Sequence, residues 1–172
     1  MKKKLKSSAG FSLVEMLCAV AILMLLCVML NSGLSVAMKT YFDLTAEAET
    51  QLLLNSLTNA IAGELRYAHE VSGTNNPTYN GGRQITLEND KRVYVDGKEL
   101  LPKEKSGTGR GGAYKNGDYQ VDKMEIVYDE SSACFTVNLK VSWQGSGISA
   151  QTPENGVVIR CLNPPKKEEA SS

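Results

Sequence analysis

The chain has 172 residues, 42% of them hydrophobic, and its 19 basic residues balance its 19 acidic ones. This length allows one short globular domain beside a membrane segment, which excludes a polytopic membrane protein and a multidomain enzyme. The zero net charge argues against a nucleic-acid binder driven by bulk charge, and the single histidine argues against the common zinc sites.

The charge is distributed unevenly at the N-terminal end. Four lysines and no acid lie in the first ten residues, and Glu15 is the only charged residue between Lys6 and Lys39. The 23 uncharged residues from Met16 to Met38 reach roughly 34 Å as a helix, enough to cross a hydrocarbon core of about 30 Å. Lysines on a short flank are expected to stay cytoplasmic, so the chain after Lys39 faces the outer side.

Two ordinary membrane signals fit this segment apart from its acid. A secretory signal peptide would be cleaved after Ser35-Val36-Ala37 and leave Met38 as the new N-terminus, whereas a plain signal anchor would stay uncleaved. Neither explains Glu15, because an acid in an apolar helix costs about 2.5–3.5 kcal/mol at mid-membrane on insertion scales. The simplest alternative role for Glu15 is an interfacial carboxylate that reaches toward the lipid head groups.

Residues 10–17 read Gly-Phe-Ser-Leu-Val-Glu-Met-Leu, between a lysine leader and a long apolar run. This combination resembles the class III leader of type IV prepilins and pseudopilins, over about residues 1–38. The resemblance implies that a prepilin peptidase cuts between Gly10 and Phe11, and that the same enzyme N-methylates Phe11. It also implies that Glu15 is the acid needed for filament assembly.

The role of Glu15 follows from charge pairing. Cleavage would leave a cationic amine on Phe11, and a buried cation and carboxylate are tolerated only as a pair. We therefore expect Glu15 of a subunit already in the filament to bind the Phe11 amine of the incoming subunit and set the axial register. Further partners that the resemblance implies are other pilin or pseudopilin subunits and an inner-membrane platform protein with its assembly ATPase.

The segment from Tyr41 to Glu70 is amphipathic. Apolar residues recur in it at mostly three- and four-residue steps, which predicts one buried helical face. That predicted face consists of Leu44, Ala48, Leu54, Leu57, Ile61, Leu65 and Ala68. Because no proline lies between Phe11 and Asn76, the membrane helix is expected to continue into this segment and end near Val71.

The hydrophobic period changes to two after Gly82, which predicts strands. The expected strands are 84–88, 92–95, 98–101, 123–129, 134–143 and 156–162, with a tight hairpin turn at Asp96-Gly97. Unbroken alternation along 134–143 favours an antiparallel sheet with one buried face. The sequence thus predicts an α+β fold, pilin-like by resemblance, in which a small sheet packs on the outer half of the long helix.

The expected organisation has four parts. They are a cleaved leader at 1–10, a hydrophobic transmembrane and assembly helix at 11–38, an extracytoplasmic domain at 39–162 and a disordered tail at 163–172.

The four cysteines divide between the two halves of the chain. Cys18 and Cys27 lie about half a turn out of phase in the apolar helix and are expected to act as small apolar residues. Cys134 and Cys161 fall at the ends of predicted strands, where an oxidising environment allows a disulfide that would contribute roughly 3–4 kcal/mol. Two free thiols are the alternative, because the strand registers do not follow from the sequence.

Other polar groups are weak candidates for a site. The stretch 106–112 lacks the Gly-Lys-Ser/Thr ending of a phosphate loop, and Asn116, Asp118 and Asp122 lack calcium-loop spacing. Residues 83–123 carry nine Lys or Arg against seven Asp or Glu, which disfavours nucleic-acid binding. His69 alone completes no nucleophile, base and acid, so we expect no catalysis, metal or cofactor.

The expected function is therefore structural. We expect a minor pilin or pseudopilin of a type IV pilus, or of a type II secretion or competence pseudopilus. It would be a single-pass protein with its N-terminus in the cytoplasm and its C-terminal domain outside. The alternative is a secreted or membrane-tethered binding module, such as an adhesin, with an ordinary signal peptide or signal anchor.

Overall fold

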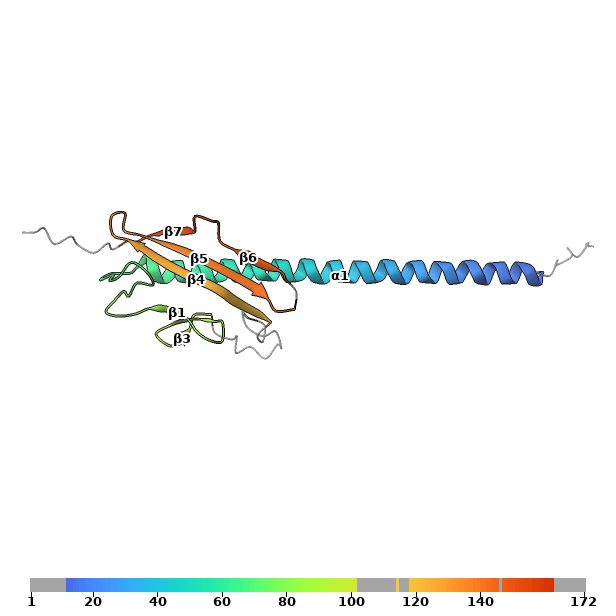
Figure 1. Cartoon of the computed structure of the whole chain (residues 1–172), viewed down its shortest axis with the longest axis horizontal. Coiled ribbons are helices and arrows are strands. Elements are labelled where there is room, and N and C mark those ends of the chain that lie inside the picture. Colours follow the sequence, from blue (N-terminus) through green and yellow to red (C-terminus); the bar gives the residue numbers. More distant parts are fainter. Residues whose placement is uncertain (1–11, 102–113, 115–117, 146, 163–172) are drawn as a thin grey trace, which may run out of the picture. The chain divides into compact units, whose positions relative to one another are not determined.

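The computed structural model describes residues 12–101, 114, 118–145 and 147–162. Within them the fold is α+β, as the sequence predicts, with one long N-terminal helix, α1 (Leu13–Arg66), followed by strands in two antiparallel sheets (Figure 1). The chain divides into two units, Met1–Asp43 and Leu44–Ser172, and α1 contributes residues to both. The expected tail lies outside the described residues.

The part of α1 in the first unit is rich in Leu, Met and Ala, which all favour helix. Two hydroxyl groups in its middle donate to carbonyl oxygens one turn earlier. Ser32 Oγ donates to Val28 at 3.0 Å, and Ser35 Oγ donates to Asn31 at 2.9 Å. These bonds satisfy both hydroxyls inside an otherwise apolar helix, so the helix continues through its one polar stretch.

The strands belong to the second unit. In chain order they are β1 (Ile85–Leu87), β2 (Val93–Val95), β3 (Lys98–Glu99), β4 (Tyr119–Asp129), β5 (Cys134–Trp143), β6 (Ser149–Gln151) and β7 (Val157–Arg160). The smaller sheet has the order β1-β2-β3. In the larger sheet β4 pairs with one edge of β5, and the other edge of β5 pairs with β6 and β7 in succession (Figure 1).

The predicted hairpin turn between β2 and β3 is confirmed. Asp96 and Gly97 have φ values of +52° and +72°. Two successive positive φ values match the twist of an antiparallel pair, and Asp-Gly is a favoured sequence for such a turn.

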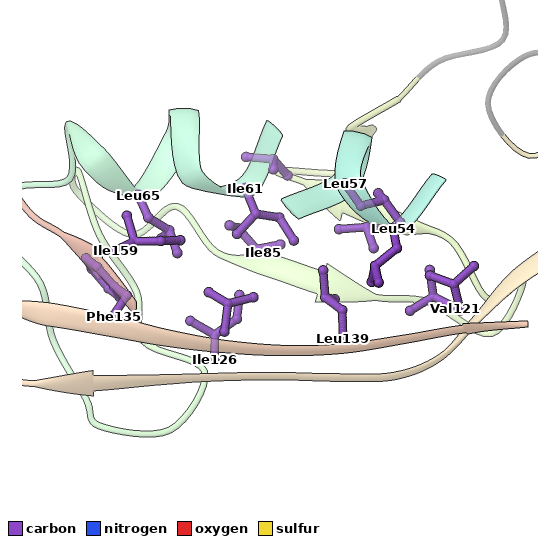
Figure 2. Close-up of a cluster of buried hydrophobic side chains, with 14 of the residues drawn as sticks. Leu54, Leu57, Ile61, Leu65, Ile85, Val121, Ile126, Phe135, Leu139 and Ile159 are labelled. Carbon is purple, nitrogen blue, oxygen red and sulfur yellow. The ribbon is translucent and has the colours of Figure 1, made fainter. Parts of the chain in front are cut away.

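The core of the second unit lies between α1 and the larger sheet. Figure 2 shows helix side chains pointing toward strand side chains, with β1 contributing from the smaller sheet. The helix residues are Leu54, Leu57, Ile61 and Leu65, and the strand residues are Ile85, Val121, Ile126, Phe135, Leu139 and Ile159. Full burial of such side chains contributes about 1.5–3 kcal/mol each, which makes this cluster the main stabilising contact of the unit.

A polar contact joins the same two elements. The Tyr119 hydroxyl on β4 donates to Glu49 Oε2 on α1 at 2.5 Å. Burial raises the pKa of Tyr119, so the hydroxyl keeps the proton that it donates. Glu49 is therefore half-buried against the sheet.

The end of α1 differs from the prediction. The helix ends at Arg66 rather than near Val71. The next residues use their backbone groups elsewhere, because the His69 N–H donates to Asn80 Oδ1 at 2.6 Å and the Asn80 N–H donates to the His69 carbonyl at 2.7 Å. Glu70 then has a φ of +51°, which a continuing α-helix does not allow.

The first turns of the predicted buried face are also wrong. Leu44 is 60% exposed and Ala48 is exposed, whereas Ala46 and Thr50 are buried. Thr50 enters the core without cost to its hydroxyl, which donates to the Ala46 carbonyl at 2.7 Å. A pattern of apolar residues does not count Thr50 as a core residue. The predicted buried face in these first turns therefore lies about half a turn around the helix from the observed one.

The strand bounds agree with the prediction best for β5, which spans 134–143 as expected. β4 begins at Tyr119 rather than Lys123. A register shift between Val121 and Lys123 interrupts the alternation of its side chains, so the sequence pattern did not reveal the first residues of this strand. β6 has three residues, of which only Ala150 is buried, and the sequence did not predict it. The predicted strands 84–88, 92–95, 98–101 and 156–162 are present as shorter strands.

Candidate functional site

The first candidate region is the start of α1. Ser12 precedes the helix and acts as its N-cap, since its Oγ accepts the Glu15 N–H at 3.3 Å and its carbonyl oxygen accepts the Met16 N–H at 3.1 Å. Glu15 thus lies in the first turn, where the helix dipole favours a negative charge. Gly10 and Phe11, the residues of the expected cleavage and methylation, lie outside the described residues.

The next 23 residues present an apolar surface. Every large apolar side chain from Leu13 to Met38 is exposed, and the least exposed is Val20 at 49%. Within the described residues, α1 is the one helix long and apolar enough to cross a membrane, with a mean hydropathy of 2.8 in its most apolar window. Side chains of this kind are stable only when lipid or other protein covers them.

Glu15 is the single charged side chain among residues 12–38. Its side chain is exposed, and no other described residue covers it. A membrane or a bundle of apolar helices would then leave its charge without water. The geometry therefore favours a positively charged partner from outside the described part of the chain.

Cys18 and Cys27 are exposed free thiols on the same helix. Their neighbours along the helix are apolar, and both belong to the surface that lipid or protein must cover. Their behaviour as small apolar residues stays a prediction.

The expected disulfide between Cys134 and Cys161 is not formed, and all four cysteines are free. Cys134 pairs with Arg160 across β5 and β7, and the Cys161 N–H donates to the Ala133 carbonyl at 3.0 Å. Since successive strand residues point to opposite faces, the two thiols lie on opposite faces of the sheet. Cys161 is buried and its Sγ donates to the Ala68 carbonyl at 2.8 Å, whereas the Cys134 Sγ donates to the Ser132 carbonyl at 3.3 Å.

A groove on the sheet face that points away from α1 is the second candidate region. Its volume is about 340 Å³. It is lined by Lys123, Glu125, Asn138, Leu139, Lys140, Gln151, Thr152, Pro153 and Glu154. Lys123 Nζ and Glu125 Oε2 form an ion pair at 3.1 Å, but both side chains are about half exposed or more, so water and salt screen it.

The charges of this groove select no ligand class. Two lysines and two glutamates give no net field, and the lining contains no aromatic ring. Sequence reasoning missed the groove, although the polar residues that alternate along β5 mark the strand face on which it lies.

The remaining sequence candidates do not converge. In the described ranges, no group of three or more His, Cys, Asp or Glu could hold a metal ion. His69 is exposed and its backbone is bonded to Asn80. Asp118 and Asp122 belong to the described residues, whereas Asn116 and the stretch 106–112 lie outside them.

Comparison with known proteins supports the first region. Residues 5–31 match the family model of the prokaryotic N-terminal methylation motif, so the chain carries the type IV prepilin-type signature. No curated protein and no solved structure matches the chain. The motif indicates a pilin-like prepilin or pseudopilin, a structural subunit that is processed by prepilin peptidase and assembles with other pilins.

Proposed function

We propose that this chain is a minor pilin or pseudopilin of a type IV pilus, or of a type II secretion or competence pseudopilus. The observation that carries the proposal is the methylation motif at residues 5–31 together with the start of α1, where every large apolar side chain from Leu13 to Met38 is exposed. Prepilin peptidase would cut between Gly10 and Phe11 and methylate the new Phe11 amine. The peptidase would therefore act on this protein, which would itself catalyse nothing.

The exposed helix suits a subunit that changes its surroundings. Before assembly, lipid chains would cover residues 13–38, with the lysine leader on the cytoplasmic side and the second unit outside. After assembly, the helices of neighbouring subunits would cover the same side chains. Because lipid chains and neighbouring helices are similarly apolar, the free energy of transferring the helix from one to the other is close to zero. Close packing and specific polar pairs then determine whether the helix stays in lipid or enters the filament.

Glu15 would provide the specific pair. It is the single charge among the described residues of the apolar segment, and it lies in the first turn of α1. The cation that pairs with it would be the methylated Phe11 amine of the incoming subunit. Extraction from the membrane would require a platform protein and an assembly ATPase acting on the cytoplasmic side.

The unbroken helix supports a minor pilin or pseudopilin over a major pilin. Many pilins have a proline in this helix, whereas this chain has none between Phe11 and Asn76, and α1 continues through every residue from 13 to 66. The size of the second unit, Leu44–Ser172, is also compatible with a minor pilin or pseudopilin.

The test of this proposal is the incorporation of Glu15→Ala into filaments. The variant should insert and be cleaved normally but enter filaments poorly, because an unpaired buried charge costs about 3–5 kcal/mol. Glu47→Ala makes the same change on an exposed site of the same helix and should incorporate like the unchanged chain. Normal incorporation of Glu15→Ala would refute the assembly role of this residue.

A further inference from the structure

Asn31 is the single amide side chain inside the apolar part of α1. It belongs to the uncharged run from Met16 to Met38 and lies seven residues, about 10 Å, before the end of that run. Its side chain is exposed, and it is too short to reach the lipid head groups as a lysine side chain could. In a membrane the amide is therefore held within the hydrocarbon.

The amide lacks the internal hydrogen bonds that its polar neighbours make. Ser32 Oγ donates to the Val28 carbonyl at 3.0 Å and Ser35 Oγ donates to the Asn31 carbonyl at 2.9 Å, so both hydroxyls are satisfied within α1. Among the described residues none bonds to the Asn31 side chain, which has two N–H donors and an acceptor oxygen. Lipid chains offer no partner, and a polar group without one in hydrocarbon is unfavourable. Its partner must therefore come from another molecule in the membrane.

A second copy of α1 supplies a matching partner. An amide is both donor and acceptor, so two identical amides can bond to each other about a twofold axis. The lysine leader gives all copies the same orientation in the membrane, and parallel identical helices place both Asn31 residues at the same depth. A different helix matches this depth only if its own sequence happens to place a polar group there.

The neighbours of Asn31 on its helix face allow the close approach that such a bond needs. Cys27 and Ser35 lie one turn before it and one turn after it, and both are small and exposed. Small residues at four-residue spacing let the backbones of two membrane helices come close together. This face of α1 thus combines a surface suited to helix contact with a polar group that requires a partner.

We propose that two copies of this chain pair in the membrane through the α1 faces that carry Cys27, Asn31 and Ser35, with hydrogen bonds between the two Asn31 amides. This pairing differs from the contact of Glu15 with the Phe11 amine, because it needs neither cleavage nor methylation. It joins two subunits before either one enters a filament. The inference rests on the insertion of α1 into the membrane, which is part of the proposed function.

The native cysteines of α1 provide the test. The full-length chain is reconstituted into vesicles of phosphatidylethanolamine and phosphatidylglycerol and oxidised with copper phenanthroline. A Cys134→Ser background removes the partly exposed thiol of the second unit. Cys27 lies within about 40° of Asn31 around the helix axis, whereas Cys18 lies about 140° away from it.

The two cysteines should therefore behave differently. Cys18→Ala, which keeps Cys27, should give a disulfide-linked dimer, because the paired faces bring the two Cys27 residues within disulfide reach. Cys27→Ala, which keeps Cys18, should give little dimer. Because Cys18 lies nearer the end of the apolar run, random collision would cross-link it at least as well as Cys27.

Replacing the amide measures its contribution. In the chain that keeps Cys27, Asn31→Leu should weaken dimerisation about three- to thirtyfold, the range that hydrogen bonds between membrane helices correspond to. The association constant comes from the cross-linked fraction over a series of protein-to-lipid ratios. Asn31→Gln keeps an amide and should retain most of the dimer.

Equal cross-linking of Cys18 and Cys27, undiminished cross-linking in Asn31→Leu, or a loss in Asn31→Gln as large as that in Asn31→Leu would overturn the inference. A chain that is monomeric in vesicles but cross-links to a different protein in native membranes would also overturn it, since the partner would then be another subunit. A chain that does not insert into vesicles refutes the proposed membrane helix and this inference with it. An inserted chain that stays monomeric refutes the inference alone, so the two failures are distinguishable.

Discussion

Replacing Leu57 tests the packing of α1 on the larger sheet. This side chain has an exposed fraction of 0% and lies in the centre of the cluster between the helix and β4 and β5 (Figure 2). Leu57→Ala removes buried methyl groups and leaves a cavity, because the surrounding strands relax only in part. Leucine-to-alanine changes at such sites lower the free energy of unfolding by about 2–5 kcal/mol.

Leu52→Ala is the matched control. It makes the same change five residues earlier on the same helix, at a side chain that is 67% exposed. Its free energy of unfolding should stay within about 0.5 kcal/mol of the unchanged chain. The difference between the two variants therefore isolates burial from helix propensity, which both substitutions change equally.

Urea unfolding of the full chain in detergent provides the assay. The chain has a single tryptophan, Trp143 at the end of β5, which packs against the core, so its fluorescence reports on the sheet. Leu57→Ala should lower the urea midpoint clearly and Leu52→Ala should not. Equal shifts in both variants, or a loss below about 1 kcal/mol for Leu57→Ala, would refute the packing described here.

Three further predictions follow from particular side chains. Gly156→Ala should cost about 1–3 kcal/mol in urea unfolding, because the φ of Gly156 is +69° and a Cβ would lie 2.6 Å from Thr136 Cγ2, while Gly147→Ala, with no atom within 4 Å, should be neutral. Stability should fall as the pH rises above about 10, because burial raises the pKa of Tyr79 to about 12 and ionisation favours the unfolded chain; Tyr79→Phe should weaken this dependence. A thiol reagent should modify Cys134 in the folded chain but Cys161 only after unfolding, and equal rates would contradict their placement on opposite faces.

The features that the sequence predicted well are local. The N-terminal motif and the apolar run depend on residue types at short spacing, and β5 alternates without interruption over its whole length. The hairpin turn at Asp96-Gly97 is likewise decided by two adjacent residues. In each case the chemistry of neighbouring residues is enough to specify the structure.

The features that it missed depend on contacts distant in the chain. The end of α1 is set by bonds between His69 and Asn80, which no helix-ending signal near residue 66 reveals. The free cysteines follow from the register of β5 and β7, since a shift of one residue would exchange the faces of Cys134 and its neighbours.

The mass and N-terminal sequence of the mature protein, expressed with a prepilin peptidase, test the central claim most directly. The account predicts a chain that begins at Phe11 and carries one methyl group on its amine. A mature chain that begins at Met38 would contradict the account and indicate an ordinary signal peptide. An unprocessed chain that retains Met1 would also contradict it and would indicate a simple membrane anchor.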